Sequence, residues 1–119
     1  MREIRIDSPM KISEIKKRFN DEFPFLKIEF FKKTHIQKQG SLRKDIIEHD
    51  FTVNPVAGVE SILISGDTSV SELEQQFMDH FKLSAQVFRK SGKTWLETTY
   101  TDGWSLKKQN EEGMELSQI

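Results

Sequence analysis

Two stretches of this chain repeat one another. Residues 11–23, KISEIKKRFNDEF, match residues 69–81, SVSELEQQFMDHF, and a shift of 58 positions lays residues 2–33 over 60–91 without a gap. Nine of the 32 aligned pairs are identical, and they include serine, glutamate, aspartate and lysine as well as apolar residues. Such self-similarity predicts an internal duplication. The alternative is that two unrelated units align because they share strand and helix periods.

Each copy has the pattern of a strand, a helix and a second strand. Isoleucines alternate with polar residues in 2–7, and 61–65 is a more apolar version of the same strand. Apolar residues then recur at helical spacing, which places them on one stripe of each helix. These residues are Ile12, Ile15, Phe19 and Phe23 in the first copy and Val70, Leu73, Phe77 and Phe81 in the second. We expect both stripes to share one core, with return strands at 26–33 and 84–90.

Both helices have start signals in the sequence. Ser8 and Pro9 predict an N-cap followed by proline at the first helical position. Ser69 and Glu72 have the spacing of a capping box. Pro24 is expected to end the first helix, because its ring clashes with a preceding helical turn.

The order of these elements predicts an α+β fold. Two strand–helix–strand units in series favour a ferredoxin-like plan, which is a four-stranded antiparallel sheet with both helices on one face. The alternative keeps the two halves as side-by-side lobes related by a pseudo-two-fold axis. In that case residues 4 and 62 would lie far apart.

The second copy continues beyond its return strand. Residues 91–93, Ser-Gly-Lys, predict a hairpin turn into an extra strand at 94–101, rich in aromatic and β-branched residues. A short helix is expected from Ser105 to Gly113, and 114–119 as a frayed tail.

One domain is expected over residues 1–119, because this length is typical of a single apolar core. Residues 34–59 form an inserted connection, within which 41–50 could form a helix.

Composition limits the classes of partner and chemistry. The 18 basic and 19 acidic residues nearly cancel, so no global field attracts DNA or anionic lipid. The chain has no cysteine, which excludes disulfides and thiolate chemistry. No apolar run is long enough for a membrane span, and the amino terminus does not have the pattern of a signal peptide. We therefore expect a cytoplasmic protein without membrane contact.

Motifs of common enzyme and cofactor sites are absent from the sequence. No GxGxxG, GxxxxGK[ST] or GxSxG pattern occurs. The three histidines, His35, His49 and His80, do not have zinc-ligand spacing. We therefore expect no catalytic residue, no cofactor and no metal, and a protein that is not an enzyme.

An interaction surface is expected on the sheet face that the helices leave open and on the carboxy-terminal strand. Charged and apolar side chains mix there, and the alternative is that another part of the chain covers the face. The candidate residues are Arg5, Lys27, Phe31, Lys33, Arg89, Trp95, Thr99 and Trp104. The strand at 94–101 has neither proline nor lysine to protect a free edge, so it could pair with a protein partner or with a second copy.

The segment 27–44 is basic and contains aromatic residues, a combination that can hold phosphates and stack bases. The candidate contacts to nucleic acid are Lys32, Lys33, Lys38, Arg43 and Lys44. The alternative is a solvated basic loop, and Phe30 is expected in the core because it aligns with Phe88.

The carboxy-terminal stretch, WLETT at 95–99 followed by TDGWSLKKQN at 101–110, resembles that of small uncharacterised bacterial α+β proteins, known as structural-genomics targets. The resemblance covers residues 84–113. It implies a bacterial cytosolic protein and transfers no functional residue.

Together these features predict a small, non-enzymatic binding domain that engages a protein. The alternative function is a module for RNA or single-stranded nucleic acid that uses 27–44.

Overall fold

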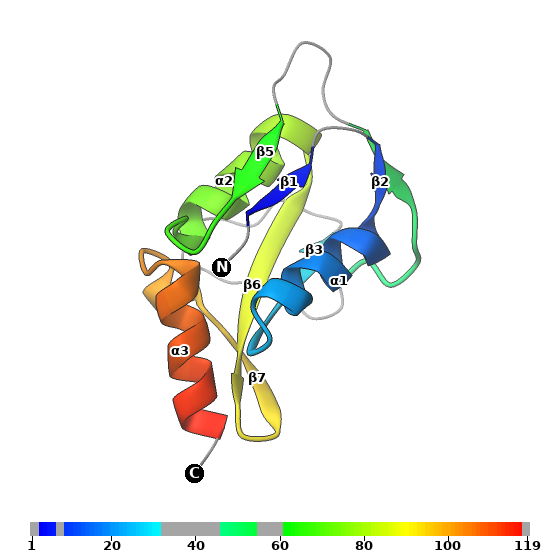
Figure 1. Cartoon of the computed structure of the whole chain (residues 1–119). Helices are drawn as coiled ribbons and strands as arrows, with labels where there is room; N and C mark the ends of the chain where they lie inside the picture. Colours follow the sequence, from blue (N-terminus) through cyan, green and yellow to red (C-terminus); the bar gives the residue numbers. More distant parts are fainter. Residues whose placement is uncertain (1–2, 7–8, 32–45, 55–60, 118–119) are drawn as a thin grey trace.

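The computed structural model describes residues 3–6, 9–31, 46–54 and 61–117. Its fold is α+β, as the sequence predicts (Figure 1). The helices are α1 (Ile12–Glu22), α2 (Val70–Phe81) and α3 (Leu106–Ser117). The strands are β1 (Ile4–Ile6), β2 (Met10–Lys11), β3 (Leu26–Phe31), β4 (Thr52–Val53), β5 (Ile62–Ile64), β6 (Ser84–Ser91) and β7 (Thr94–Glu97), and the 3-10 turn η2 spans Thr99–Thr101.

Among the described residues, the strands form three small antiparallel sheets. β1 pairs with β5, β2 pairs with β4, and the third sheet has the order β3-β6-β7. A ferredoxin-like sheet would place β1 and β5 between the two return strands. That arrangement is not confirmed, because the return strands β3 and β6 pair directly with one another from Leu26–Arg89 to Phe31–Ser84. A ladder along the longer strands satisfies more main-chain groups than the three-residue strands β1 and β5 could offer.

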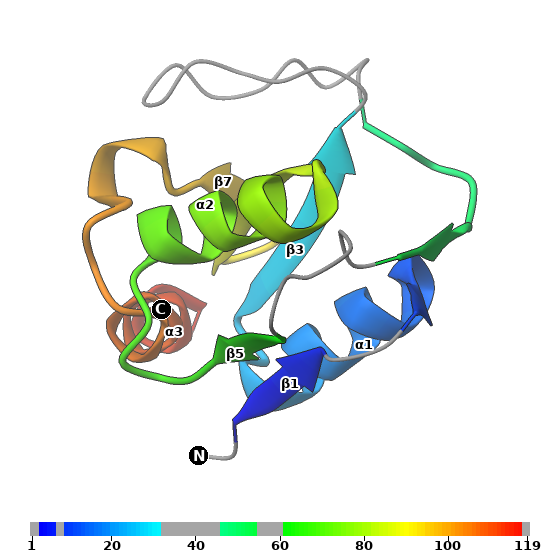
Figure 2. The same ribbon diagram turned by 90° about the horizontal axis from the view of Figure 1, so that it is seen from above.

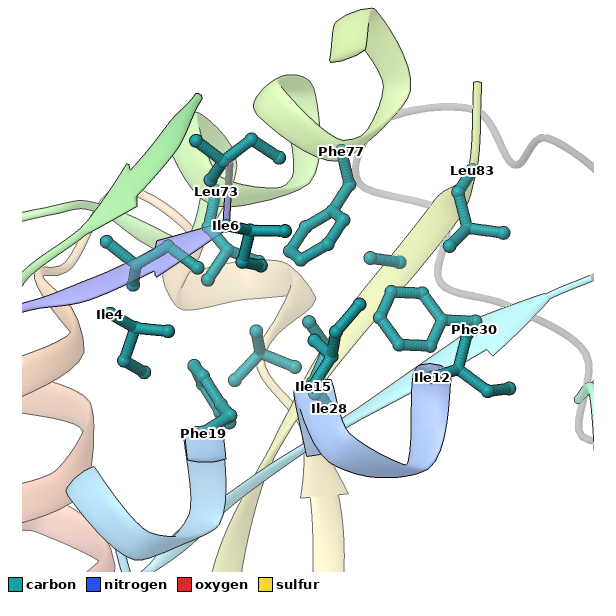
Figure 3. Close-up of a cluster of buried hydrophobic side chains, with 14 of the residues drawn as sticks. Ile4, Ile6, Ile12, Ile15, Phe19, Ile28, Phe30, Leu73, Phe77 and Leu83 are labelled. Carbon is teal, nitrogen blue, oxygen red and sulfur yellow. The ribbon is translucent and has the colours of Figure 1, made fainter. Parts of the chain in front are cut away.

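The two copies close around one core. Ile4 and Ile62 lie in neighbouring strands of the β1–β5 ladder, so the alternative with distant lobes does not describe this structure. Phe19 of α1 and Phe77 of α2 are both buried in the same apolar cluster (Figure 3). The aromatic ring of Phe77 also contacts that of Phe30, with 5.2 Å between centroids.

All three helices pack on the same face of the β3-β6-β7 sheet. Successive side chains of a strand point to opposite faces, and the inward set of β3 and β6 lies in the core with residues of each helix. The β1–β5 ladder adds its isoleucines to the same core, beside α1 and α2 (Figure 2). The inward residues of β3 and β6 are Leu26, Ile28, Phe30, Ala85 and Val87. The opposite face of the sheet carries no helix among the described residues.

The alignment by 58 residues fails at the return strands. Phe30 is fully buried, as expected, but its aligned partner Phe88 is half-buried on the opposite face of the sheet. α2 ends one residue later in the alignment than α1, and its connection to the return strand is one residue shorter, with Lys82 in a left-handed conformation at φ 54°. The two return strands thus begin at aligned positions but turn aligned side chains to opposite faces, because the faces of a strand alternate with each residue.

The amino terminus of α1 differs from the prediction. Pro9 precedes β2, and the helix begins only at Ile12, with no cap from the side chain of Lys11. Ser8 lies outside the described residues. The segment after β3 supplies the missing acceptors instead: Ile12 N–H donates to Phe51 O at 3.0 Å, and Ser13 N–H donates to Asp50 Oδ1 at 3.0 Å. Asp50 is therefore a cap that reaches α1 from 37 residues away.

Replacing Asp50 by alanine is expected to lower the melting temperature by a few degrees at neutral pH, because α1 loses its cap. Hydrogen bonds from Ser13 hold the pKa of Asp50 below its ordinary value of 3.8. The carboxylate therefore stabilises the fold above about pH 3.8, and its contribution is lost as the pH falls below that value. Thermal melts of wild type and variant should converge below pH 4. The exposed neighbour Glu48 provides the control, since its replacement by alanine should not change the melting temperature.

The start of α2 confirms the predicted capping box. Glu72 N–H donates to Ser69 Oγ at 3.1 Å, and Ser69 Oγ donates to Glu72 Oε1 at 3.0 Å. The chain after β7 adds two acceptors, because Val70 N–H donates to Trp104 O at 3.2 Å and Ser71 N–H donates to Asp102 O at 2.8 Å. Both helices thus receive main-chain hydrogen bonds from the segment that follows their own return strand.

The carboxy-terminal helix is longer than predicted. Ser105 Oγ accepts from Lys108 N–H at 3.1 Å and caps α3, as expected. The helix continues through Gly113 to Ser117, so 114–117 are helical rather than frayed. Gly113 is buried against the backbone and side chain of Phe25. Its lack of a side chain permits a close helix approach instead of ending the helix.

The described part of the inserted connection, residues 46–54, is extended. Ile46 pairs with Phe31, and Ile47 is buried. The helix suggested for 41–50 is absent at 46–50, and 41–45 lie outside the described residues. The predicted strand at 94–101 ends at Glu97, where η2 takes over.

Candidate functional site

A groove crosses the outer face of the β3-β6-β7 sheet. Its volume is about 460 Å³. Among the described residues, four apolar side chains, three of them aromatic, form much of its lining, together with two lysines and one carboxylate. The lining residues are Lys27, Phe31, Ile46, Phe88, Lys93, Thr94, Trp95 and Glu97.

Strand alternation explains how these residues converge. Lys27 and Phe31 occupy alternate positions of β3, opposite the positions that enter the core. Phe88 pairs with Lys27 across the ladder and with Glu97 of β7 on its other side. Trp95 is two residues before Glu97 and therefore shares its face. Each strand thus contributes at least one groove residue.

Cations lie over the aromatic rings of this groove. Lys27 Nζ is 5.2 Å from the ring centroid of Trp95 and 5.4 Å from that of Phe88. Lys90 Nζ is 5.9 Å from the Trp95 ring. These distances lie within the range of cation–π attraction. Lys27 Nζ is also 3.7 Å from Glu29 Oε2, so a carboxylate partly offsets its charge. The groove is therefore aromatic with a cationic rim, and two lysines, Lys27 and Lys90, lie over the ring of Trp95.

Three of the predicted interaction residues meet in this groove, namely Lys27, Phe31 and Trp95. Lys33 lies outside the described residues, and so do all the predicted nucleic-acid contacts, Lys32, Lys38, Arg43 and Lys44 among them. Those predictions remain untested by the structure.

Arg89, Trp104 and Thr99 lie apart from the groove. Arg89 is on the helix-covered face, where its Nη1 donates to Gln109 Oε1 at 2.9 Å. The guanidinium of Arg89 and the ammonium of Lys108 both contact the Trp104 ring, with Lys108 Nζ 4.2 Å from the centroid. Thr99 is buried in η2. The structure thus places Arg89 and Trp104 where they hold α3 against the sheet.

Arg5 lines a separate, charged hollow of about 270 Å³ between β1 and α1. It pairs with Leu63 across the β1–β5 ladder, and its Nη1 donates to Ser61 Oγ at 3.4 Å. Glu3, Arg18, Asp21 and Glu22 line the same hollow. The mixture of both charge signs shows no preference for an anion or a cation.

Sequence reasoning missed Phe88 and Ile46 as groove residues. The repeat aligns Phe30 with Phe88, and the prediction that Phe30 lies in the core takes Phe88 as a core residue too. The signal that could have corrected this is the position of Phe88 one residue after Val87, since neighbouring residues of a strand face opposite ways. Ile46 had no usable signal, because its place depends on how the inserted connection returns to β3.

A buried carboxyl group lies outside the groove, on α2. Burial raises the pKa of Glu74 to about 8, with smaller contributions from the carboxylates of Asp102 and Glu97. A hydrogen bond from the backbone of Val87 acts in the opposite direction. Glu74 Oε2 is buried and has no hydrogen-bond partner within the described part of the chain. The group is therefore protonated at neutral pH.

Two further searches concern the described residues only. Residues 3–6, 9–31, 46–54 and 61–117 contain no group of three or more histidine, aspartate or glutamate side chains arranged to hold a metal ion. Within the same part of the chain, no helix is both long and apolar enough to cross a membrane.

Comparison with known proteins yields no relative: no family model, no curated protein and no solved structure matches the chain. The resemblance of residues 84–113 to small bacterial proteins therefore stays a prediction.

Proposed function

We propose that the chain is a small, non-enzymatic domain that binds a protein through the groove on the outer face of β3-β6-β7. The observation that carries this proposal is the convergence of Phe31, Phe88 and Trp95 in one groove, on the sheet face opposite α1, α2 and α3. Aromatic residues in a concave site are typical anchors of protein interfaces. A cytoplasmic location remains a prediction from the cysteine-free sequence.

The charge of the groove favours an acidic partner segment. Lys27 and Lys93 line the groove, Lys90 lies over Trp95, and Glu97 is the single carboxylate among the described lining residues. Opposite charges steer association and select against basic partners. Apolar side chains of the partner would contact Phe88 and Trp95, while its carboxylates would face the lysines.

RNA is the alternative ligand, since cationic and aromatic groups together also suit single-stranded nucleic acid. The observation in its favour is that Lys27, the first residue of the basic segment 27–44, lies over two aromatic rings. We favour protein because Lys27 is already paired with Glu29 and the whole chain is nearly neutral.

The experiment compares wild type with Trp95→Ala in a pull-down from host lysate, followed by mass spectrometry and by analysis of retained RNA. Truncating an aromatic anchor is expected to reduce retention of a specific protein about tenfold or more. The matched control is Leu63→Ala, because Leu63 is exposed on β5, outside the groove. It should leave retention unchanged.

The outcomes separate the two ligands. A defined protein that Trp95→Ala loses supports the proposal. RNA retained at low salt and lost in the same variant would replace it with the alternative. Equal retention by wild type and Trp95→Ala would contradict both.

We also infer that the two halves derive from a duplication, as the 58-residue repeat predicts. The matched hydrogen bonds support this inference, because Ile12 N–H and Val70 N–H, which align in the repeat, each donate to a carbonyl beyond their own return strand. The pairing of β1 with β5 and of β3 with β6 joins corresponding strands of the two copies.

A further inference from the structure

The edge of the sheet at β7 has main-chain groups that point away from the sheet. Thr98 N–H donates to Val87 O, so these two residues form a hydrogen-bonded pair. Such pairs alternate along an antiparallel ladder. Leu96 therefore bonds to Arg89 of β6, whereas the N–H and C=O groups of Trp95 and Glu97 face outward. Among the described residues, no strand pairs with this side of β7.

The side chains of β7 do not protect this edge. The strand reads Thr-Trp-Leu-Glu and contains neither proline nor lysine. Its pairing with β6 runs without a skipped residue from Phe88–Glu97 to Ser91–Thr94, so no bulge twists the edge away. Leu96 is 45% exposed, on the face opposite the groove. Natural proteins rarely leave such an edge without a partner.

The charges at the two ends of β7 are self-complementary. Lys93 immediately precedes the strand, and Glu97 is its last residue. A two-fold axis requires two copies of one strand to pair antiparallel. Antiparallel pairing brings the lysine end of each copy towards the glutamate end of the other. A second copy of this chain therefore fits the edge electrostatically.

The outward groups also select the register. Hydrogen-bonded pairs must join outward-facing residues of both copies, which are Trp95 and Glu97. If the axis passes through Leu96, Trp95 of each copy pairs with Glu97 of the other, and every bonded residue lies within β7. The two exposed Leu96 side chains then face one another and leave water. An axis through Trp95 would instead need Lys93, which belongs to the hairpin turn.

We propose that β7 pairs with β7 of a second copy, antiparallel and centred on Leu96. The result is a continuous six-stranded sheet in which both grooves lie on the same face. Residues that are directly opposite in a ladder share a face, so Trp95 of one copy approaches Glu97 of the other across the joined grooves. The interface is small, and the dimer is expected to be weak.

The test uses the symmetry of position 96. Leu96→Lys and Leu96→Glu each place two like charges opposite one another at the axis, so each variant alone should be monomeric in sedimentation equilibrium. An equimolar mixture should form a heterodimer, because lysine then faces glutamate. Wild type should show a dimer as its concentration is raised to about 1 mM. The control is Leu63→Lys, since Leu63 has a similar exposure of 38% on another strand, and this variant should dimerise like wild type.

Several results would overturn the proposal. These are a wild type that stays monomeric, a dimer that tolerates Leu96→Lys, or a mixture of the two charged variants that does not associate. A second measurement needs no variant: the amides of Trp95 and Glu97 should exchange hydrogen more slowly in concentrated than in dilute wild type. Equal exchange at both concentrations would also contradict it.

The groove is tested separately, because the Leu96 side chain points away from it. If Leu96→Lys is monomeric but still retains the partner protein, the groove binds its partner without the dimer. Loss of partner retention in Trp95→Ala alone addresses the groove.

Discussion

Replacing Glu74 by glutamine is expected to flatten the pH dependence of stability between pH 4.5 and 8. Burial raises the pKa of this carboxyl group from its ordinary value of 4.5 to about 8 in the folded protein. Between these values the folded state holds a proton that the unfolded state releases. The free energy of unfolding therefore falls as the pH rises, by up to about 1.4 kcal/mol for each pH unit.

The difference between Glu74→Gln and wild type should accordingly grow with pH and reach about 3 kcal/mol or more near pH 8. Urea denaturation at pH 5, 6, 7 and 8 measures it. Glutamine keeps the size of the side chain and an acceptor for the Val87 backbone but cannot acquire a charge. The test compares how the free energy of unfolding changes with pH in the two proteins, not its absolute value. The buried NH₂ group of the new glutamine changes the absolute stability at every pH.

Glu72→Gln is the matched control for this measurement. Glu72 lies on the same helix, is exposed and takes part in the capping box. Its replacement should leave the slope between pH 5 and 8 as in wild type. A Glu74→Gln variant that retains the full slope would show that another group causes the pH dependence.

Replacing Gly113 by alanine is expected to destabilise the protein by about 1–3 kcal/mol, because the added carbon overpacks a buried contact. A Cβ at this position would lie 2.9 Å from Phe25 Cβ, 3.0 Å from Phe25 O and 3.2 Å from Arg89 Cγ. The backbone carbonyl cannot move aside as a flexible side chain would. In an exposed helix the same substitution would be favourable by about 1 kcal/mol, so the sign of the effect reports the close approach of α3.

Thermal and urea denaturation of Gly113→Ala measure this effect. Gly103→Ala is the control, since a Cβ there would meet no atom within 4 Å. That variant should be close to wild type in stability. A Gly113→Ala protein that is more stable than wild type would mean that α3 packs less closely on β3 and β6.

Local patterns predicted the elements of this fold well. The spacing of Ile12, Ile15 and Phe19 and of Val70, Leu73 and Phe77 identified both helices and their buried stripes. Ser69 and Glu72 form the capping box, and Gly92 lies at the hairpin turn. Each of these features depends on a few neighbouring residues, and therefore can be recognised without the rest of the chain.

Predictions that required long-range pairing were less successful. The helix α1 has its cap from Asp50, a residue that its own neighbourhood does not reveal. The sequence pattern at Ser8-Pro9 predicts a local start of this helix, but Pro9 precedes β2. The repeat aligned Phe88 with Phe30 as core residues, although the shorter connection after α2, with Lys82 in a left-handed conformation, leads to a strand that turns Phe88 to the outer face.

The groove shows the same division. Sequence patterns placed Lys27 and Phe31 on an outward sheet face and Trp95 on the carboxy-terminal strand, and these three residues meet in the groove. The sequence could not show that Ile46 lies beside them, nor that Arg89 and Trp104 belong to the contact with α3. These contacts depend on which strands and helices pack together, and that cannot be recognised from neighbouring residues.

By itself, the order of residues determined the α+β class, the positions of the helices and the apolar faces that they bury. Periodicity and capping are properties of adjacent residues, so they survive without knowledge of distant contacts. Only the tertiary structure decided that β3 pairs with β6, that Glu74 Oε2 is buried and that no described strand pairs with the outer side of β7. These outcomes depend on contacts between segments that are remote in the sequence. The whole core must pair its main-chain groups and bury its apolar side chains at the same time, so no single segment determines them.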